Sequence, residues 1–510
     1  MAYEKEVSEH EARRQKALAM GGPKKLAERK AAGQLNARER IDYLVDSGSF
    51  LESGLFGTSI RPEVRDKTPA DGKITGLGRI QGRKTAIVSD DFTVMGASNS
   101  DTNARKIQHV RQIAETQGLA MVYLCESAAA RMPDAMGSTG IARKDAPTQF
   151  LRVRETPWAA AALGKCYGLS LWNICMSDFV VMRKGATMSV SSPRITSLAV
   201  GQEIDAETLG GWRLHTETTG LVDVAVDTDE EALDLVKRFL SYLPATCNQA
   251  PPVHPVPSGS DEAIKRILDI VPESRAQVYD SRKVIACIAD KDTVLELKPR
   301  YGKSVVTALT RINGRTVGIV ANNPLYKGGA VDVDACQKAT GFFVLCDSFN
   351  VPIVMLSDVP GFLVGLETER KGAPGKIVNW MNALSLCTVP KIAIVMRKGY
   401  GQAIVNMGGS GNAHEFALWF TGELSLMDPR TAAGAVHGVK EQDDPARFAQ
   451  LVEEMTKATS PYERGAGYTA HAILDPRETR DYLTRTLDYY SNELTQGVGK
   501  HRLATWPTSY

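Results

Sequence analysis

One segment of the sequence recurs 232 residues further along the chain, and this repeat limits the folds that the chain can adopt. The segment LGRIQGRKTAIV, starting at Leu77, aligns without gaps with LTRINGRTVGIV, starting at Leu309, and seven positions are identical. At the same offset Lys106 aligns with Lys338. Ordered matches at one spacing indicate that a single structural unit is duplicated in tandem.

A proline-rich stretch separates the two copies. Residues 244–260 read PATCNQAPPVHPVPSGS, a composition typical of an extended linker between domains. We therefore expect an N-terminal domain at residues 1–250 and a C-terminal domain at residues 251–510. Each is long enough to bury a core of its own.

Each copy alternates strand patterns with helix patterns. A β-branched strand (TAIVSDD; VGIVANN) is followed by a helical segment (NARKIQHVRQIAETQG; DACQKATGFFVLCDSFN) and a buried strand (AMVYLCE; VPIVMLSD). This order predicts an α/β fold in both halves. Asn36, followed by Glu39, predicts a capping box at the start of a short helix. Residues 476–494 carry apolar residues at helical spacing and predict a packing helix.

Composition excludes several classes of partner. The 61 basic and 59 acidic residues give a net charge of +2 without long blocks of one sign, so we expect neither nucleic acid nor an anionic membrane as partner. There is no apolar run approaching about 18 residues and no signal-peptide pattern. The eight cysteines form no CxxC pair, which favours reduced core residues over a metal site.

Sharp turns of small residues follow two strands of each copy. SAAAR (127–131) and DVPGF (358–362) follow the buried strands, and CYG (166–168) and YGQA (400–403) follow later strands. Backbone N–H groups at such turns lack internal partners. Two converging N–H donors would stabilise the enolate of a thioester or the ureido oxygen of biotin. The alternative is that these are ordinary loops whose small residues permit close packing.

The motifs of several other enzyme classes are absent from the sequence. There is no GxxxxGK[ST] phosphate loop, no GxSxG elbow and no HExxH motif. A hydratase that works by acid–base catalysis needs two acids aimed at one substrate. Glu126 and Asp358 occupy equivalent places in the two copies, too far apart in the repeat to form such a pair.

Ordered motifs along almost the whole chain resemble one family, the carboxyltransferase (β) subunits of acetyl-, propionyl- and methylcrotonyl-CoA carboxylases in the crotonase superfamily. The resemblance is carried by AAGQLNARERIDYLVDSGSFLE, DDFTVMGAS, VGQEIDAETLGGWRLHTETTGLVD, VDVDACQKATGFFVLCDSFNVPIVMLSDVPGFLVG and TVPKIAIVMRKGYGQA. It implies two tandem crotonase-like domains with the ββα superhelix, related by internal duplication. The N-terminal domain would bind acyl-CoA and the C-terminal domain would bind biotin.

The resemblance also implies the reaction and the assembly. The chain would transfer CO2 from carboxybiotin to the α-carbon, or a vinylogous carbon, of an acyl-CoA, through an enolate and within a ligase complex. It would form a hexamer, a trimer of dimers, with the active site at a dimer interface. Because the sequence has no MKM biotinylation motif and no ATP-grasp-like region, a biotin carboxylase/biotin carboxyl carrier α subunit is expected to carry the biotin. No metal is expected, and the expected location is the cytoplasm, or the mitochondrial matrix in a eukaryote.

The roles of individual residues follow from motif matching to the family. The acyl-CoA oxyanion is expected to accept from the N–H groups around Ala128, Ala129, Tyr167 and Gly168. Biotin is expected to accept from those around Gly361, Phe362, Gly401, Gln402 and Ala403. The expected substrate-binding residues are Arg131, Ile404 and Val405. Position 405 is often acidic in propionyl-type enzymes, so valine there favours a different acyl group.

The turns depart from the family pattern, which has SGGAR for SAAAR, AGG for CYG and YGGA for YGQA. The added Cβ atoms restrict positive φ, so either the backbone avoids that region or the pocket is reshaped. Two alternatives therefore stay open. One is a carboxyacyl-CoA decarboxylase or transcarboxylase of the same fold, and the other is a catalytically degenerate assembly subunit.

Overall fold

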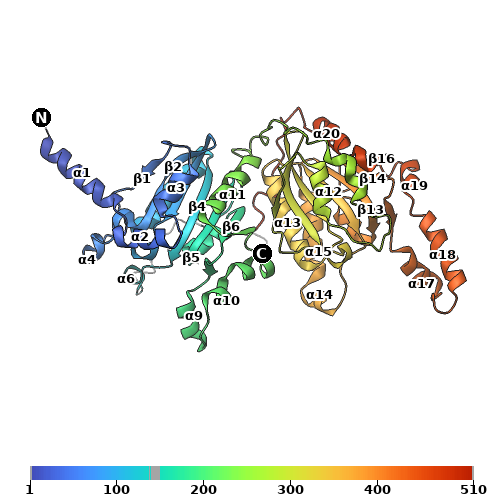
Figure 1. The fold of residues 1–510 in the computed structure, drawn as a ribbon, viewed down its shortest axis with the longest axis horizontal. Helices are drawn as coiled ribbons and strands as arrows, with labels where there is room; N and C mark the ends of the chain where they lie inside the picture. Colours follow the sequence, from blue (N-terminus) through green and yellow to red (C-terminus); the bar gives the residue numbers. More distant parts are fainter. Residues whose placement is uncertain (1–2, 137, 139–149, 410, 508–510) are drawn as a thin grey trace. The chain divides into compact units, whose positions relative to one another are not determined.

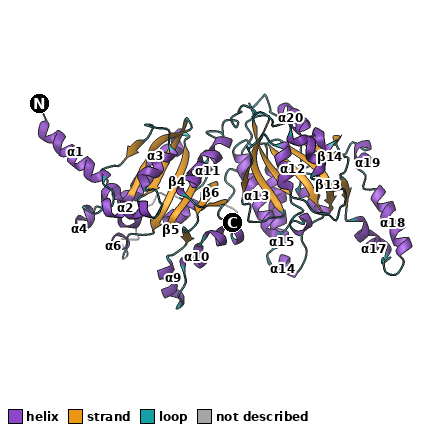
Figure 2. Cartoon of the chain, viewed as in Figure 1, coloured by secondary structure: helices purple, strands orange, loops and turns teal. Residues whose placement is uncertain are grey.

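The chain divides into two compact units, described here separately. The computed structural model describes residues 3–136, 138, 150–409 and 411–507. Unit 1 is Met1–Cys247 and unit 2 is Asn248–Tyr510 (Figure 1). Each unit contains a β-sheet flanked by helices (Figure 2). No helix of the described residues is long and apolar enough to cross a bilayer.

Unit 1 is built on a mixed sheet in the order β1-β2-β3-β4-β5-β6-β8, with β7 paired to β5. Pairs β1–β2 and β2–β3 are antiparallel, and the pairs from β3 to β8 are parallel. The strands are β1 (Leu51–Ser53), β2 (Lys73–Ile80), β3 (Arg83–Asp90), β4 (Ala120–Ala128), β5 (Trp158–Tyr167), β6 (Phe179–Arg183), β7 (Thr187–Ser189) and β8 (Val224–Val226).

Helices cover both faces of this sheet. Helices α5 and α8 contact β2 to β5 on one face, while α3 and α11 contact each other and strands β2, β3, β5 and β6. The helices and helical turns are α1 (Glu4–Leu18), α2 (Pro23–Ala31), α3 (Ala37–Leu44), α4 (Pro62–Arg65), η1 (Pro69–Gly72), η2 (Met95–Ala97), α5 (Asp101–Gln117), α6 (Met132–Ala135), α8 (Leu169–Cys175), α9 (Pro193–Val200), α10 (Ala206–Gly210), η3 (Leu214–Thr218) and α11 (Asp229–Tyr242). The predicted capping box is present at α3, where the Asn36 side chain accepts from Glu39 N.

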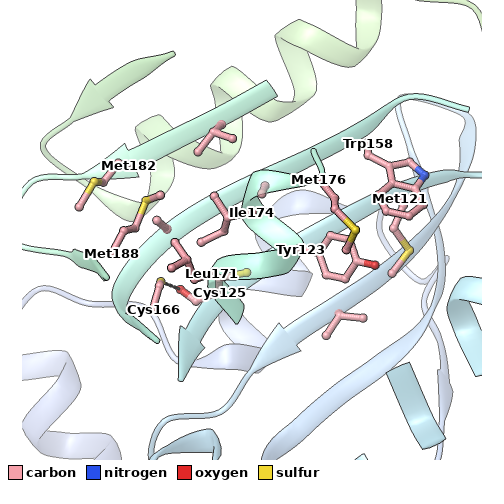
Figure 3. Packing of buried hydrophobic residues seen from close by; sticks show 14 of the residues in the cluster. Met121, Tyr123, Cys125, Trp158, Cys166, Leu171, Ile174, Met176, Met182 and Met188 are labelled. Carbon is pink, nitrogen blue, oxygen red and sulfur yellow. Dashed lines mark hydrogen bonds between the residues drawn. The ribbon is translucent and has the colours of Figure 1, made fainter. Parts of the chain in front are cut away.

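The face of the sheet under α5 and α8 holds the main apolar core of unit 1. Met121, Tyr123 and Cys125 alternate along β4 and pack with Leu171 and Ile174 of α8 (Figure 3). Every second side chain of a strand lies on the same face, and both faces of β4 are buried, as its apolar run predicted. The core therefore clamps α8 against the ends of β4 and β5.

Unit 2 repeats this topology. Its sheet has the order β16-β14-β13-β12-β11-β10-β9, with β15 paired to β13, and only β9–β10 and β10–β11 are antiparallel. The strands are β9 (Leu295–Leu297), β10 (Val305–Ile312), β11 (Arg315–Asn322), β12 (Ile353–Val359), β13 (Lys391–Tyr400), β14 (Glu415–Trp419), β15 (Glu423–Ser425) and β16 (Ala472–Leu474).

The sheet of unit 2 is also covered on both faces. Its apolar core includes residues of η4, α12 and α20 on one face, and α13 contacts β10, β11 and α15. The helices and helical turns are η4 (Ala263–Asp269), α12 (Ser281–Ile288), η5 (Lys327–Gly329), α13 (Val333–Ser348), α14 (Leu366–Arg370), α15 (Ala373–Leu386), α16 (Gly401–Asn406), α17 (Pro429–His437), α18 (Pro445–Lys457), α19 (Pro461–Ala466), η6 (Pro476–Glu478) and α20 (Thr479–Tyr489). The predicted C-terminal packing helix is α20.

The α/β class and the internal duplication are confirmed. Strands β2 and β3 and their counterparts β10 and β11 begin and end at the same positions of the 232-residue offset. Even an isolated bridge recurs, because Asn99 pairs with Ala130 and Val331 pairs with Phe362. The proline-rich stretch contacts unit 2, where His254 N donates to Gly314 O at 2.9 Å.

A buried lysine is repeated with its hydrogen bonds. Lys106 Nζ donates to Ala70 O (2.7 Å) and Lys73 O (2.5 Å), and Lys338 Nζ donates to Tyr301 O (3.0 Å) and Val305 O (2.7 Å). Burial lowers the pKa of Lys106 to about 8 and that of Lys338 to about 7. Each amine therefore ties the long helix of its unit to the start of a strand.

Replacing Lys338 by methionine is expected to reduce the dependence of stability on pH. Between pH 7 and 10.5 the unfolded chain binds this proton more tightly than the folded chain, so the stability that this position contributes falls as pH falls through that window. As pH rises through this window, the free energy of unfolding of the wild type should increase by up to about 1.4 kcal/mol per pH unit more than that of the variant. Denaturant unfolding from pH 7 to about pH 9 tests this.

Lys371→Met, at an exposed lysine of the same unit, is the matched control and should leave the slope unchanged. Equal slopes for wild type and Lys338→Met would contradict the prediction.

Candidate active site

In each unit, the turns singled out in the sequence follow the C-terminal ends of two adjacent parallel strands. In unit 1, Ala128 ends β4 and lies opposite Tyr167, which ends β5. In unit 2, the same places are taken by the ends of β12 and β13, where Val359 lies opposite Gly399. Parallel strands bring the loops that follow them to one edge of the sheet.

The two turns of unit 1 meet at Ala129 and Gly168. A Cβ placed on Gly168 would lie 3.2 Å from the Cβ of Ala129. Ala129 is half-buried and has φ of 74°, and Gly168 has φ of 60°. Both residues lie where the pairing of β4 with β5 ends, because Ala128 and Tyr167 are the last paired residues of these strands. The two turns thus bring Ala129 and Gly168 next to each other at one end of the sheet.

The turns of unit 2 have the same form. Gly361 follows β12 with φ of 141°, and Gly401 follows β13 with φ of 61° as the first residue of α16. Phe362 pairs with Val331 as Ala130 pairs with Asn99. The N–H groups of the first residues of a helix have no acceptor within it, which leaves those of Gly401, Gln402 and Ala403 without helical partners.

The departures from the family pattern have different structural consequences. At the SAAAR turn the backbone keeps a left-handed conformation in spite of the alanine side chain, as the φ of Ala129 shows. Tyr167 is an extended strand residue, and Gln402 is helical, so their Cβ atoms cause no strain of this kind. Tyr167 is 3% exposed and matches Tyr400 of unit 2, whose hydroxyl donates to Glu423 Oε2 at 2.9 Å.

Arg131 faces the protein interior. Its side chain is 1% exposed, its Nη1 donates to Asp71 Oδ1 at 2.7 Å, and its Nε and Nη2 donate to Ser98. These contacts fix the end of the SAAAR turn. The predicted contact between Arg131 and substrate stays a prediction.

The other predicted substrate-binding residues lie on α16. Ile404 is 8% exposed and Val405 is half-buried. The side chain of Gln402 is exposed and reaches Met381 Sδ at 3.7 Å. The helix therefore presents Gln402 and Val405, more than Ile404, to its surroundings.

The acids of the two repeated strands, Glu126 and Asp358, are both held in ion pairs with arginine side chains. Glu126 pairs with Arg29 and Arg40, each at 2.8 Å; burial alone would raise its pKa, but the two arginines hold the pKa below its ordinary value. Asp358 pairs with Arg397 at 3.0 Å and is fully buried. Both carboxylates are therefore occupied by ion pairs within the chain.

Asp90 and Ser170 of unit 1 form hydrogen bonds close to the turns but were not singled out in the sequence. The Ser170 hydroxyl donates to Asp90 Oδ2 at 2.9 Å, and Glu126 N donates to the same oxygen at 3.0 Å. A signal existed in the repeat, because Asp90 aligns with Asn322 at the 232-residue offset. A charge present in only one copy marks a place where the copies have diverged.

A family model described as the carboxyl transferase domain matches residues 28–503. The propionyl-CoA carboxylase beta chain of Roseobacter denitrificans is 32% identical over 492 residues, which cover 95% of this chain and 96% of that protein. The methylmalonyl-CoA carboxyltransferase 12S subunit of Propionibacterium freudenreichii subsp. shermanii is 34% identical, over 96% of this chain and 95% of its own.

A solved structure of transcarboxylase 12S has the same fold. It matches with a TM-score of 0.88 and 32% identity, and the match covers 95% of both chains. That structure is described as a hexamer assembly with methylmalonyl-coenzyme A and methylmalonic acid bound. The expected pair of tandem crotonase-like domains is thereby confirmed.

Replacing Ala129 by glycine is expected to stabilise unit 1. An L-residue in the left-handed region costs about 1–2 kcal/mol, and the greater freedom of glycine in the unfolded chain offsets about 0.5–1 kcal/mol of the gain. We expect a net increase of about 0.5–1 kcal/mol in the free energy of unfolding, measured by denaturant titration.

The neighbouring Ala128→Gly is the matched control. Ala128 ends a strand without positive φ, so glycine there should destabilise the protein by about 0.5–1 kcal/mol. Equal losses in both variants would show that Ala129 carries no strain.

Proposed function

This chain belongs to the carboxyl transferase domain family, and we propose that unit 1 binds an acyl-CoA and unit 2 binds carboxybiotin during carboxyl transfer. The chain is an enzyme of the propionyl-CoA carboxylase and transcarboxylase family, to which its relatives belong over nearly their full lengths. The assignment of one substrate to each unit is the proposal.

The duplicated pair of turns carries this proposal. Carboxyl transfer has to stabilise an acyl-CoA enolate, and it has to hold a biotin ureido group whose oxygen becomes more negative as CO2 leaves. Both demands suit neutral donors aimed at one oxygen. The chain supplies a pair of strand-end turns in unit 1 and an equivalent pair in unit 2.

In unit 1, the N–H groups of Ala129 and Gly168 are assigned to the thioester oxygen. They would be preorganised for the charge that would develop on this oxygen when the α-proton passes to the biotin nitrogen that CO2 has left, because the turns are fixed before substrate arrives. Ala128 and Tyr167 end the two strands and set the direction of these donors. Arg131 acts here as a positioning residue, through its ion pair with Asp71.

In unit 2, the N–H groups of Gly361, Phe362, Gly401, Gln402 and Ala403 are assigned to biotin. When bound, carboxybiotin supplies the CO2. Uncharged N–H donors fit a ureido oxygen, which is a neutral acceptor in the ground state. The N–H groups of the first turn of α16 add the positive end of a helix dipole.

The proposed assembly has further components. The transcarboxylase structure is described as a hexamer, and we propose a hexamer for this chain. The biotin is proposed to come from an α subunit that carries biotin carboxylase and biotin carrier domains. Localisation in the cytoplasm, or in the mitochondrial matrix of a eukaryote, stays a prediction.

A second candidate function keeps the site and changes the direction of transfer. The relative named methylmalonyl-CoA carboxyltransferase, 34% identical to this chain, favours a transcarboxylase that moves CO2 from a carboxyacyl-CoA. The third candidate is an assembly subunit that binds both ligands without turnover, motivated by the departures at Ala129 and Tyr167.

The three functions are separated by one assay. We expect the chain, copurified with its biotinylated partner and given ATP, bicarbonate and a panel of acyl-CoAs, to yield one carboxylated acyl-CoA by mass spectrometry. Product only from a carboxyacyl-CoA donor, without ATP, would identify a transcarboxylase. A biotin-loaded complex that binds acyl-CoA and converts none of the panel would contradict the enzymatic proposal.

Gly168→Ala is expected to lower kcat at least about tenfold, because a displaced oxyanion donor loses much of its effect. The added Cβ would lie 3.2 Å from Ala129 Cβ and strain a φ of 60°. Gly185→Ala is the matched control. It introduces a similar backbone strain at a φ of 84°, but no atom lies within 4 Å of the added Cβ. Steady-state kinetics of both variants test the assignment, and equal kcat values would contradict it.

A further inference from the structure

Asp90 connects the two elements that deliver the oxyanion donors of unit 1. It is the last residue of β3 and is 3% exposed. One carboxylate oxygen accepts from Lys73 Nζ at 2.7 Å. The other accepts from Glu126 N of β4 at 3.0 Å and from the Ser170 hydroxyl of α8 at 2.9 Å.

These contacts lie close in sequence to the donors. Glu126 precedes Ala129 by three residues, and Ser170 follows Gly168 by two. The register between β4 and β5 shifts between Cys125 and Ser127, so strand pairing is interrupted at Glu126. Asp90 accepts the N–H at this irregularity and holds α8 through the same oxygen.

Unit 2 has only part of this arrangement. Its strand β12 has a register shift between Ser357 and Val359, and Asp358 N donates to Asn322 Oδ1 at 3.3 Å. At the offset of the repeat, Asn322 replaces Asp90 and Val305 replaces Lys73. Ala403, which follows Gly401 as Ser170 follows Gly168, has no hydroxyl to link the helix. The charged link between strand and helix is therefore a feature of unit 1.

We propose that Asp90 is a positioning residue for carboxyl transfer, which fixes the N–H of Ala129 and the N–H of Gly168 relative to each other through β4 and α8. This inference rests on the proposed function, because it takes these N–H groups as the oxyanion donors. Misplacing a donor by a fraction of an ångström weakens its hydrogen bond to the developing charge.

The ion pair with Lys73 prevents the Asp90 carboxylate from repelling the negative charge that develops on the enolate oxygen. An isolated negative charge beneath the donors would repel the enolate oxygen in a medium of low dielectric constant. The ammonium group of Lys73, 1% exposed, cancels it at 2.7 Å. The ion pair thus provides two strong acceptor bonds without leaving net charge at the site.

Two variants remove the hydrogen bonds of Asp90 that connect β4 to α8. Each introduces the residues that occupy the equivalent positions of unit 2. Ser170→Ala removes only the bond to α8. The double variant Lys73→Val/Asp90→Asn replaces the ion pair by the valine and asparagine of the equivalent positions, so no buried charge loses its partner. We expect hydrogen–deuterium exchange in α8 to rise about tenfold, since hydrogen bonds to charged groups are the stronger ones. We expect kcat to fall about tenfold, with KM for the acyl-CoA within about twofold, because substrate contacts remain and only the donor geometry changes.

Asp178→Asn is the matched control. Asp178 is also a buried carboxylate of unit 1; it accepts from Trp158 N at 2.8 Å and pairs with Arg154 at 3.2 Å, but at the opposite end of β5 from the turns. It should lower the melting temperature without raising exchange in α8 or lowering kcat.

The outcomes separate this inference from the proposed function. Unchanged exchange in α8, unchanged kcat in variants with a loosened α8, or an equal loss of kcat in Asp178→Asn would each overturn the role of Asp90. If the wild-type complex transfers carboxyl to or from no acyl-CoA, the proposed function fails. The exchange measurement then still decides whether Asp90 holds α8.

Discussion

Two adjacent parallel strands end together in each unit, and the turns that follow them carry the N–H groups that we propose as donors to the ligands. In unit 1 these are the N–H groups of Ala129 and Gly168, which lie next to each other. The sheet, the core on its face and the ion pairs beneath the turns hold these turns in place.

Duplication gave each unit a pair of turns at the ends of two adjacent parallel strands, and the two copies then diverged. The fold-building contacts are retained, as the buried Lys106 and Lys338 show by donating to equivalent carbonyl groups. The contacts beneath the turns differ, with a charged link through Asp90 in unit 1 and a neutral one through Asn322 in unit 2. An enolate places more negative charge on one oxygen than a ureido group does. The charged link through Asp90, which would fix the proposed donors of unit 1 more rigidly, agrees with this difference in charge.

Sequence patterns predicted the elements that carry the site but not all of its contacts. Continuous apolar runs placed β4 and β12, because a strand buried on both faces requires apolar residues at successive positions. Arg131 was predicted as a substrate-binding residue by motif matching to the family; in the structure its side chain pairs with Asp71 in the interior, and its contact with substrate stays a prediction. The link from Asp90 to Ser170 spans 80 residues, and no local pattern records such a contact.

The sequence alone determined the duplication, the α/β class and the positions of the four turns, because these follow from local periodicity and from matches at one offset. Only the tertiary structure decided how each turn accommodates its departure from glycine. Alanine is compatible with either sign of φ at a cost, and the surrounding strands force Ala129 to 74° while Gln402 is free to join a helix. The physical reason is that backbone conformation at a strand end is set by neighbouring strands, which lie far away in the sequence.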